Sequence, residues 1–223
     1  MSTDVIQKRL KQNGFTEEHY EALGRAVAVG YETVRKLISE TPMLSQFGPG
    51  IANAGNLRNI AVEFALQSVA ADSKLFYTAM NWNAARNHLH LRVNYGGVVL
   101  TSHYCGKRGD SAVRKAVVRG ELAKRNGDLF SDEAGIPDID HLSSNTYIQL
   151  AHSGDLKPRN AMLMIPNRDQ VTYTLPPLIL DIPEPDAHKV EQIENQVKKR
   201  FDLIVEKELR DGTDFSTDSP EAS

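Results

Sequence analysis

The segment from His88 to Cys105 reads HLHLRVNYGGVVLTSHYC and decides the fold. Before Gly96, apolar and polar residues alternate, which is the pattern of a β-strand with one face toward the core. Gly96 and Gly97 then predict a two-residue hairpin turn in which both glycines adopt positive φ. A second apolar-rich run follows the turn. The segment therefore predicts an antiparallel β-hairpin.

A two-residue turn also sets which side chains face each other. The register places His90 opposite His103. It places His88 opposite Cys105 in the same way, so these four side chains gather on one face. A four-residue loop would shift the pairs by one step and keep the face. A three-residue loop would place Leu100 among polar side chains, and we reject it for that reason.

Three histidines and a thiol on one face are typical of a metal-binding or catalytic site. Histidines at alternate positions of a strand, with a third across the ladder, can hold a divalent metal such as zinc. Without metal, neighbouring imidazoles serve as acid and base near neutral pH, and nearby cations hold an anionic substrate. The predicted catalytic residues are His88, His90, His103, Arg92 and Lys107. The predicted metal ligands are His88, His90, His103 and Cys105. The structural alternative is that the histidines are surface or hydrogen-bonded core residues and that the cysteine is a small buried hydrophobe.

A basic segment follows the hairpin, from Lys107 to Arg125. Its net charge is +5, because seven basic residues stand against Asp110 and Glu121. Residues 111–124 predict a helix, and a basic stripe beside a histidine face is suited to binding a phosphate backbone. The predicted nucleic-acid-binding residues are Lys107, Arg108, Arg114, Lys115, Arg119, Lys124 and Arg125. The alternative is a solvated helix face that pairs with the acidic end of the chain.

The whole pattern predicts an α+β fold, with N-terminal helices packed on a mainly antiparallel β-sheet and a helix at the C-terminal side. Helices are expected over 3–11, 16–40 and 57–71, the third of them central and buried, and a glycine-rich loop over 47–55. The expected organisation is a single domain over 1–210, with a helical part over 1–72, mainly sheet over 73–182 and a C-terminal helix over 183–210, followed by a disordered acidic tail over 211–223.

Composition narrows the classes of protein. The chain has 223 residues, 40% of them hydrophobic, and a net charge of −3, so any polyanion must bind to a local patch. Its one cysteine excludes an intramolecular disulfide and a cysteine-rich zinc module. We find neither an exporting N-terminal segment nor a run of about 18–20 apolar residues, and we therefore expect a cytoplasmic protein without a membrane partner.

We therefore expect a nucleic-acid-directed protein, with phosphodiester hydrolysis as its reaction, of a kind used in prokaryotic defence or regulation. Two alternatives stay open. One is a non-enzymatic interaction protein, such as an antitoxin, immunity or assembly factor, whose basic helix and acidic tail contact a protein partner. The other is a small-molecule metalloenzyme.

Overall fold

Six strands form one mixed sheet, and their spatial order follows their order in the chain. The computed structural model describes residues 3–82, 89–109, 113, 116–126, 146–167, 170, 173 and 176–195. The strands are β1 (Tyr77–Trp82), β2 (Leu89–Tyr95), β3 (Val98–Tyr104), β4 (Thr146–Gly154), β5 (Pro158–Met164) and β6 (Leu178–Ile179). Only β3 and β4 pair in parallel, and every other ladder is antiparallel. The predicted α+β fold with a mainly antiparallel sheet is confirmed.

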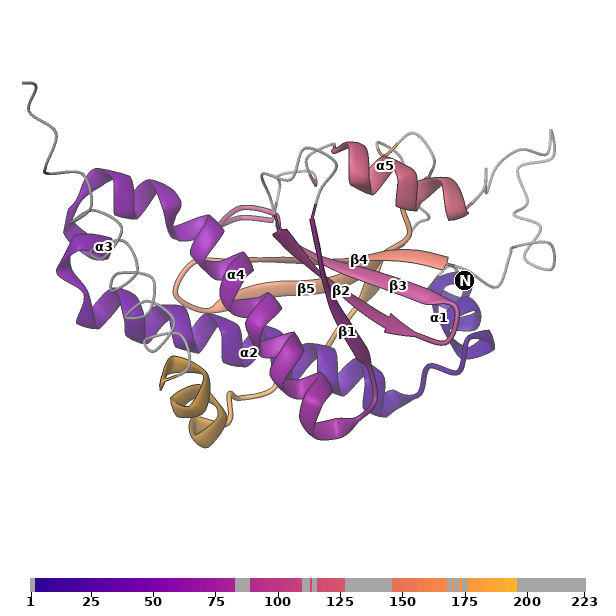
Figure 1. Ribbon diagram of the computed structural model, residues 1–223, viewed down its shortest axis with the longest axis horizontal. Helices are drawn as coiled ribbons and strands as arrows, with labels where there is room; N and C mark the ends of the chain where they lie inside the picture. The colour runs from indigo at the N-terminus through magenta and orange to yellow at the C-terminus, as the bar shows by residue number, and fades with distance from the viewer. Residues whose placement is uncertain are drawn as a thin grey trace, which may run out of the picture.

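The helices lie on both sides of this sheet (Figure 1). They are α1 (Thr3–Gln12), α2 (Glu17–Glu40), α3 (Pro42–Gln46), α4 (Gly48–Ser73), α5 (Val117–Ala123) and the 3-10 turn η1 (Lys124–Asn126). Residues 187–195 are also helical, at the start of the predicted C-terminal helix. The rest of that helix and the predicted acidic tail lie outside the described residues. None of the helices in the described part of the chain has the length and apolar content needed to cross a membrane.

The main core lies between the sheet and the pair of helices α2 and α4. Alternate residues of the central strands point into it, among them Leu100, Ile148 and Leu163, each exposed by 1% or less. Of the two helices, α2 has the longer buried run, and Gly30 brings it against the backbone of α4. In α4, Val62 and Leu66 are buried while Ile60 is 57% exposed. The core is therefore centred on α2 rather than on the helix that the sequence predicts as central.

The opposite face of the sheet is covered by α5 and η1. Leu122 and Ala123 of α5 pack on Val99 and Tyr147 in a second apolar cluster. Figure 1 shows α5 above the strands, on the other side from α2, while the far ends of α2 and α4 extend past the strands to the left, where α3 joins them. The sheet is thus the middle layer of three.

The hairpin between β2 and β3 has the predicted two-residue turn, and Tyr95 pairs with Val98 across it. Only Gly96 has a positive φ, at +54°, so the turn resembles type II′ rather than the predicted form with two positive φ values. A Cβ at this glycine would also lie 2.8 Å from the carbonyl oxygen of Asn13. The ladder ends after the pair Val93–Leu100. The predicted direct pairing of His90 with His103 is therefore not formed, because the strands separate beyond that point.

Two predicted boundaries are wrong for physical reasons. The glycine-rich segment 47–55 is not a loop, since α4 begins at Gly48 with a proline in its first turn, where a proline ring already has a helical φ and needs no N–H partner. The helix predicted over 111–124 begins only at Val117. Ala116 is extended, with φ −151°, and Val113 is buried beside Cys105 in a third small cluster.

Candidate functional site

Polar and basic side chains converge on the sheet face that α5 covers. We call this set the basic sheet face and define it as His90, Arg92, Thr101, His103, Tyr147, Gln149 and Arg119. The first two come from β2, the next two from β3, the two after them from β4, and the last from α5. Alternation along the strands places them together, because the intervening residues point into the main core.

A chain of hydrogen bonds links polar side chains of β3 and β4 at the floor of this face. Gln149 Nε2 donates to the hydroxyl of Tyr147 over 3.3 Å. The Tyr147 hydroxyl lies 2.7 Å from Thr101 Oγ1, which lies 2.7 Å from Nε2 of His103. If each hydroxyl donates once and accepts once, Thr101 donates to the imidazole, whose proton then sits on Nδ1. Thr101, Tyr147 and Gln149 are all buried, so this chain holds His103 in one orientation.

Burial and surrounding charge keep His103 neutral. Its pKa lies well below the ordinary value of 6.5, first because the ring is desolvated and then because Arg119 and two histidines, His152 and His90, act on it. Burial likewise lowers the pKa of Arg92, with a further contribution from the charge of Arg125. Among the described residues, no carboxylate contributes to the pKa shift of either group. The face is therefore rich in positive charge.

His90 lies beside Arg92 on β2, where Arg92 Nε donates to His90 Nε2 over 3.3 Å. A ring nitrogen that accepts a hydrogen bond carries no proton, so His90 is neutral in this arrangement. Since an arginine stays protonated, the pair presents one cation and one imidazole side by side. That combination offers a guanidinium that can donate to a phosphate oxygen and an imidazole nitrogen that can accept a proton from a neighbouring group.

Two amide side chains fix α5 over the face. Gln170 accepts the N–H of Ala116, 3.3 Å away, just before α5 begins. Asn126, buried at the end of η1, accepts the N–H of Tyr147 at 2.7 Å and donates to the carbonyl oxygens of Tyr147 and Pro166. These bonds take the place of pairing with β5 at the start of β4, and they hold α5, which carries Arg119, against the sheet. No feature of the sequence alone indicated that these amides join α5 to the sheet.

The predicted metal ligands are not brought together within the described residues. No group of three or more His, Cys, Asp or Glu side chains there could hold a metal ion, and His88 lies outside those residues. Cys105 is buried among Val113, Ala151 and Met162, and burial raises the pKa of its thiol to about 11. This apolar environment disfavours the thiolate that a zinc ligand needs.

The basic segment divides between several places. Lys107 forms an ion pair with Asp155, 2.9 Å away, and Lys124 forms one with Glu121, 2.7 Å away. Arg108 is exposed beyond the end of β3, and Arg125 is exposed in η1. Arg114 and Lys115 lie outside the described residues. Of the seven predicted nucleic-acid-binding residues, the structure therefore places Arg119 in the basic sheet face itself, with Arg125 close enough to act on Arg92.

A second line of polar groups crosses the helical face of the sheet, and sequence reasoning did not find it. The hydroxyl of Tyr31 lies 3.2 Å from His152 Nδ1, and His152 Nε2 lies 3.3 Å from Asn59 Oδ1. Asn59 Nδ2 donates to Glu63 over 3.1 Å. The Glu63 carboxylate also accepts the N–H of Leu91, where β2 has left β3. This line fills the gap in the β2–β3 ladder from the α4 side.

Comparisons of the chain with protein-family models, with curated proteins and with solved structures found no match in any of the three. The interpretation of the site therefore depends on its geometry. The hairpin register predicts Thr101 opposite Arg92 on this face, whereas Tyr147 and Gln149 are the members that the sequence did not indicate. The alternation of residues 146–151 predicts that Tyr147 and Gln149 share a face, but only the parallel pairing of β4 with β3 shows which one.

Proposed function

We propose that this protein binds nucleic acid through the basic sheet face. The observation that carries the proposal is the environment of Arg92. Its partly buried guanidinium donates to His90 and is destabilised by the charge of a second arginine, Arg125. In the part of the chain that the structure describes, no carboxylate stabilises this guanidinium or compensates for the hydration that it loses. A phosphate supplies the missing charge and matches the two-pronged geometry of a guanidinium.

The histidines support phosphodiester hydrolysis as the reaction at this face. His90 Nε2 accepts a hydrogen bond from Arg92, and when a phosphate binds Arg92 in its place, this nitrogen can take a proton from an attacking water. His103, whose Nε2 faces Thr101, would keep a neutral imidazole beside it. The positive charge of Arg92 and Arg119 would stabilise the extra negative charge that develops on the phosphate. We place this activity in the cytosol, as the sequence leads us to expect.

The test is equilibrium binding of labelled single-stranded and duplex oligonucleotides, measured by fluorescence anisotropy as salt rises from about 50 mM to about 200 mM. Arg92→Gln should lower affinity about tenfold and reduce the slope of log affinity against log salt by about 0.7–0.9, the share of one phosphate contact. Arg25→Gln removes an equal charge from the exposed surface of α2, where Arg25 pairs with Glu21, and serves as the matched control.

Product analysis on the same oligonucleotides tests the reaction, with His90→Gln as the variant that removes one proton carrier. The proposed binding face would be wrong if the wild-type chain does not bind the oligonucleotides even at low salt. It would also be wrong if Arg92→Gln and Arg25→Gln weaken binding equally. If the wild-type chain binds the oligonucleotide but leaves it intact after long incubation, the proposed hydrolysis is wrong and the proposed binding still stands.

A further inference from the structure

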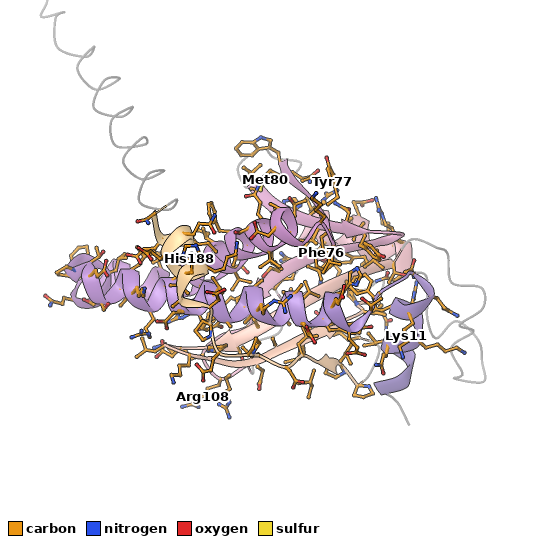
Figure 2. All side chains as sticks on the ribbon, turned by 90° about the horizontal axis from the view of Figure 1, so that it is seen from below. Lys11, Phe76, Tyr77, Met80, Arg108 and His188 are labelled. Carbon is orange, nitrogen blue, oxygen red and sulfur yellow. The ribbon has the colours of Figure 1, made fainter. Side chains whose placement is uncertain are left out.

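The edge strand β1 carries an exposed aromatic ring on the same side as the basic sheet face. Tyr77 is the first residue of β1 and is 72% exposed. It pairs directly with Asn94 of β2, and directly opposed residues share a face of the sheet. Since residues two apart on a strand also share a face, Tyr77 lies on the side of Arg92. Figure 2 shows Tyr77 projecting at the outer side of the molecule.

Three cross-strand pairs form a row on this side of β1 and β2. Along the row lie Tyr77 with Asn94, Ala79 with Arg92, and Asn81 with His90. Successive pairs are about 6.6–6.8 Å apart, since each step spans two residues of a strand. The row thus presents a ring, then a cation, then an amide beside an imidazole. Ala79 has a much shorter side chain than Tyr77 and Asn81 on either side of it, so the β1 side of the row is recessed at its middle.

We infer that the nucleic acid bound here is single-stranded and that one of its bases stacks on Tyr77. This inference rests on the proposed function. An exposed ring on a sheet can stack on the flat face of a base only when that base has left its own stack, which a single strand permits and a duplex does not. Arg92, one step along the row, is placed to take the adjoining phosphate. The recessed position at Ala79 gives the backbone room to pass.

The opposite side of β1 offers a matched control. Trp82 is 59% exposed on the same strand, but it pairs with Leu89 and faces the other way, with Met80. Its ring is larger than that of Tyr77 and would offer a base more stacking surface if the side of the strand made no difference. A base that lies in the row beside Arg92 cannot reach it.

The experiment compares the wild-type chain with Tyr77→Ala, Tyr77→Phe and Trp82→Ala. The probes are a labelled oligothymidine, its duplex with oligoadenosine, and an abasic strand with the same number of phosphates. We expect tighter binding of the single strand than of the duplex. Tyr77→Ala should lower single-strand affinity about tenfold, the usual scale for one stacked base. Tyr77→Phe should restore it, and Trp82→Ala should leave it unchanged.

Salt separates the two proposals. Tyr77→Ala should keep the wild-type salt slope, because stacking releases no counterion, whereas Arg92→Gln should reduce it. The abasic strand should bind the wild-type chain as weakly as oligothymidine binds Tyr77→Ala. If Arg92→Gln weakens binding while Tyr77→Ala does not, or if duplex binds as tightly as single strand, the single-strand inference is wrong and the binding face stands. If the wild-type chain binds no probe, both proposals fail.

Discussion

Glu63 should make the stability of this protein depend on pH in a direction unusual for a carboxylate. Its side chain accepts the N–H of Leu91 and the amide of Asn59, and both bonds favour the charged form. Burial outweighs them and raises the pKa to about 7. Glu63→Gln replaces the carboxyl with a neutral amide of the same size, which resembles its protonated state. The variant therefore isolates the charge.

The magnitude follows from the difference between about 7 and the ordinary value of 4.5. At about 1.4 kcal/mol per pH unit, this difference corresponds to about 3 kcal/mol. Because the folded pKa is raised, the favourable contribution of Glu63 is complete below pH about 4.5 and is lost as pH rises through about 7. Glu63→Gln should therefore gain stability over the wild-type chain as pH rises, by up to about 3 kcal/mol.

The assay is chemical denaturation of both proteins at several values between about pH 5 and about pH 8. The quantity to follow is the difference in the free energy of unfolding between Glu63→Gln and the wild-type chain. The contributions of the buried histidines are the same in both proteins and cancel in this difference. Glu21→Gln removes an exposed carboxylate from α2 and should show no comparable rise. A difference between Glu63→Gln and wild type that stays constant with pH would refute the reasoning, since it would mean that Glu63 is solvated in the folded protein.

Two further pairs of variants test the packing. Gly30→Ala should destabilise the fold by about 1–3 kcal/mol, because its Cβ would lie 2.8 Å from the α4 backbone. Gly48→Ala meets open space and should change stability by less than about 1 kcal/mol in thermal unfolding. Asp155→Ala should cost about 3 kcal/mol, because it leaves the buried guanidinium of Arg58 without its carboxylate. Lys107→Ala removes only an exposed partner of the same Asp155 and should cost less than about 1 kcal/mol; equal losses in either pair would contradict the packing described.

The hairpin could be predicted from sequence because its signals are local. Alternation in residues 88–95 is unambiguous, and a Gly-Gly pair between two such runs leaves few turns to choose from. The same locality explains why α1 and α2 are found close to their predicted bounds, with Thr16 just before α2. These features need only neighbours in the chain. They settle which side chains share a face of β2.

The composition of the basic sheet face could not be predicted, because it needs contacts between distant segments. Tyr147 enters the face only through the parallel pairing of β4 with β3, and no local pattern specifies that pairing. Beyond the end of the β2–β3 ladder, the N–H of Leu91 is bound by Glu63, which lies on a helix that is distant in sequence. His152 is fully buried between α2 and α4, although its place in strand β4 resembles that of any exposed polar residue.

Strands that are neighbours in the sheet are also neighbours in the chain, and this order affects how the sheet folds. The antiparallel ladders from β1 to β3 and from β4 to β5 join segments that are close in sequence and close quickly, since short loops lose little entropy. The parallel ladder joins β3, which ends at Tyr104, to β4, which begins only at Thr146. Contacts between distant segments form slowly. During synthesis β3 is therefore an open edge, with unpaired N–H and C=O groups, until β4 emerges, and an unfinished chain is most prone to aggregate during that interval.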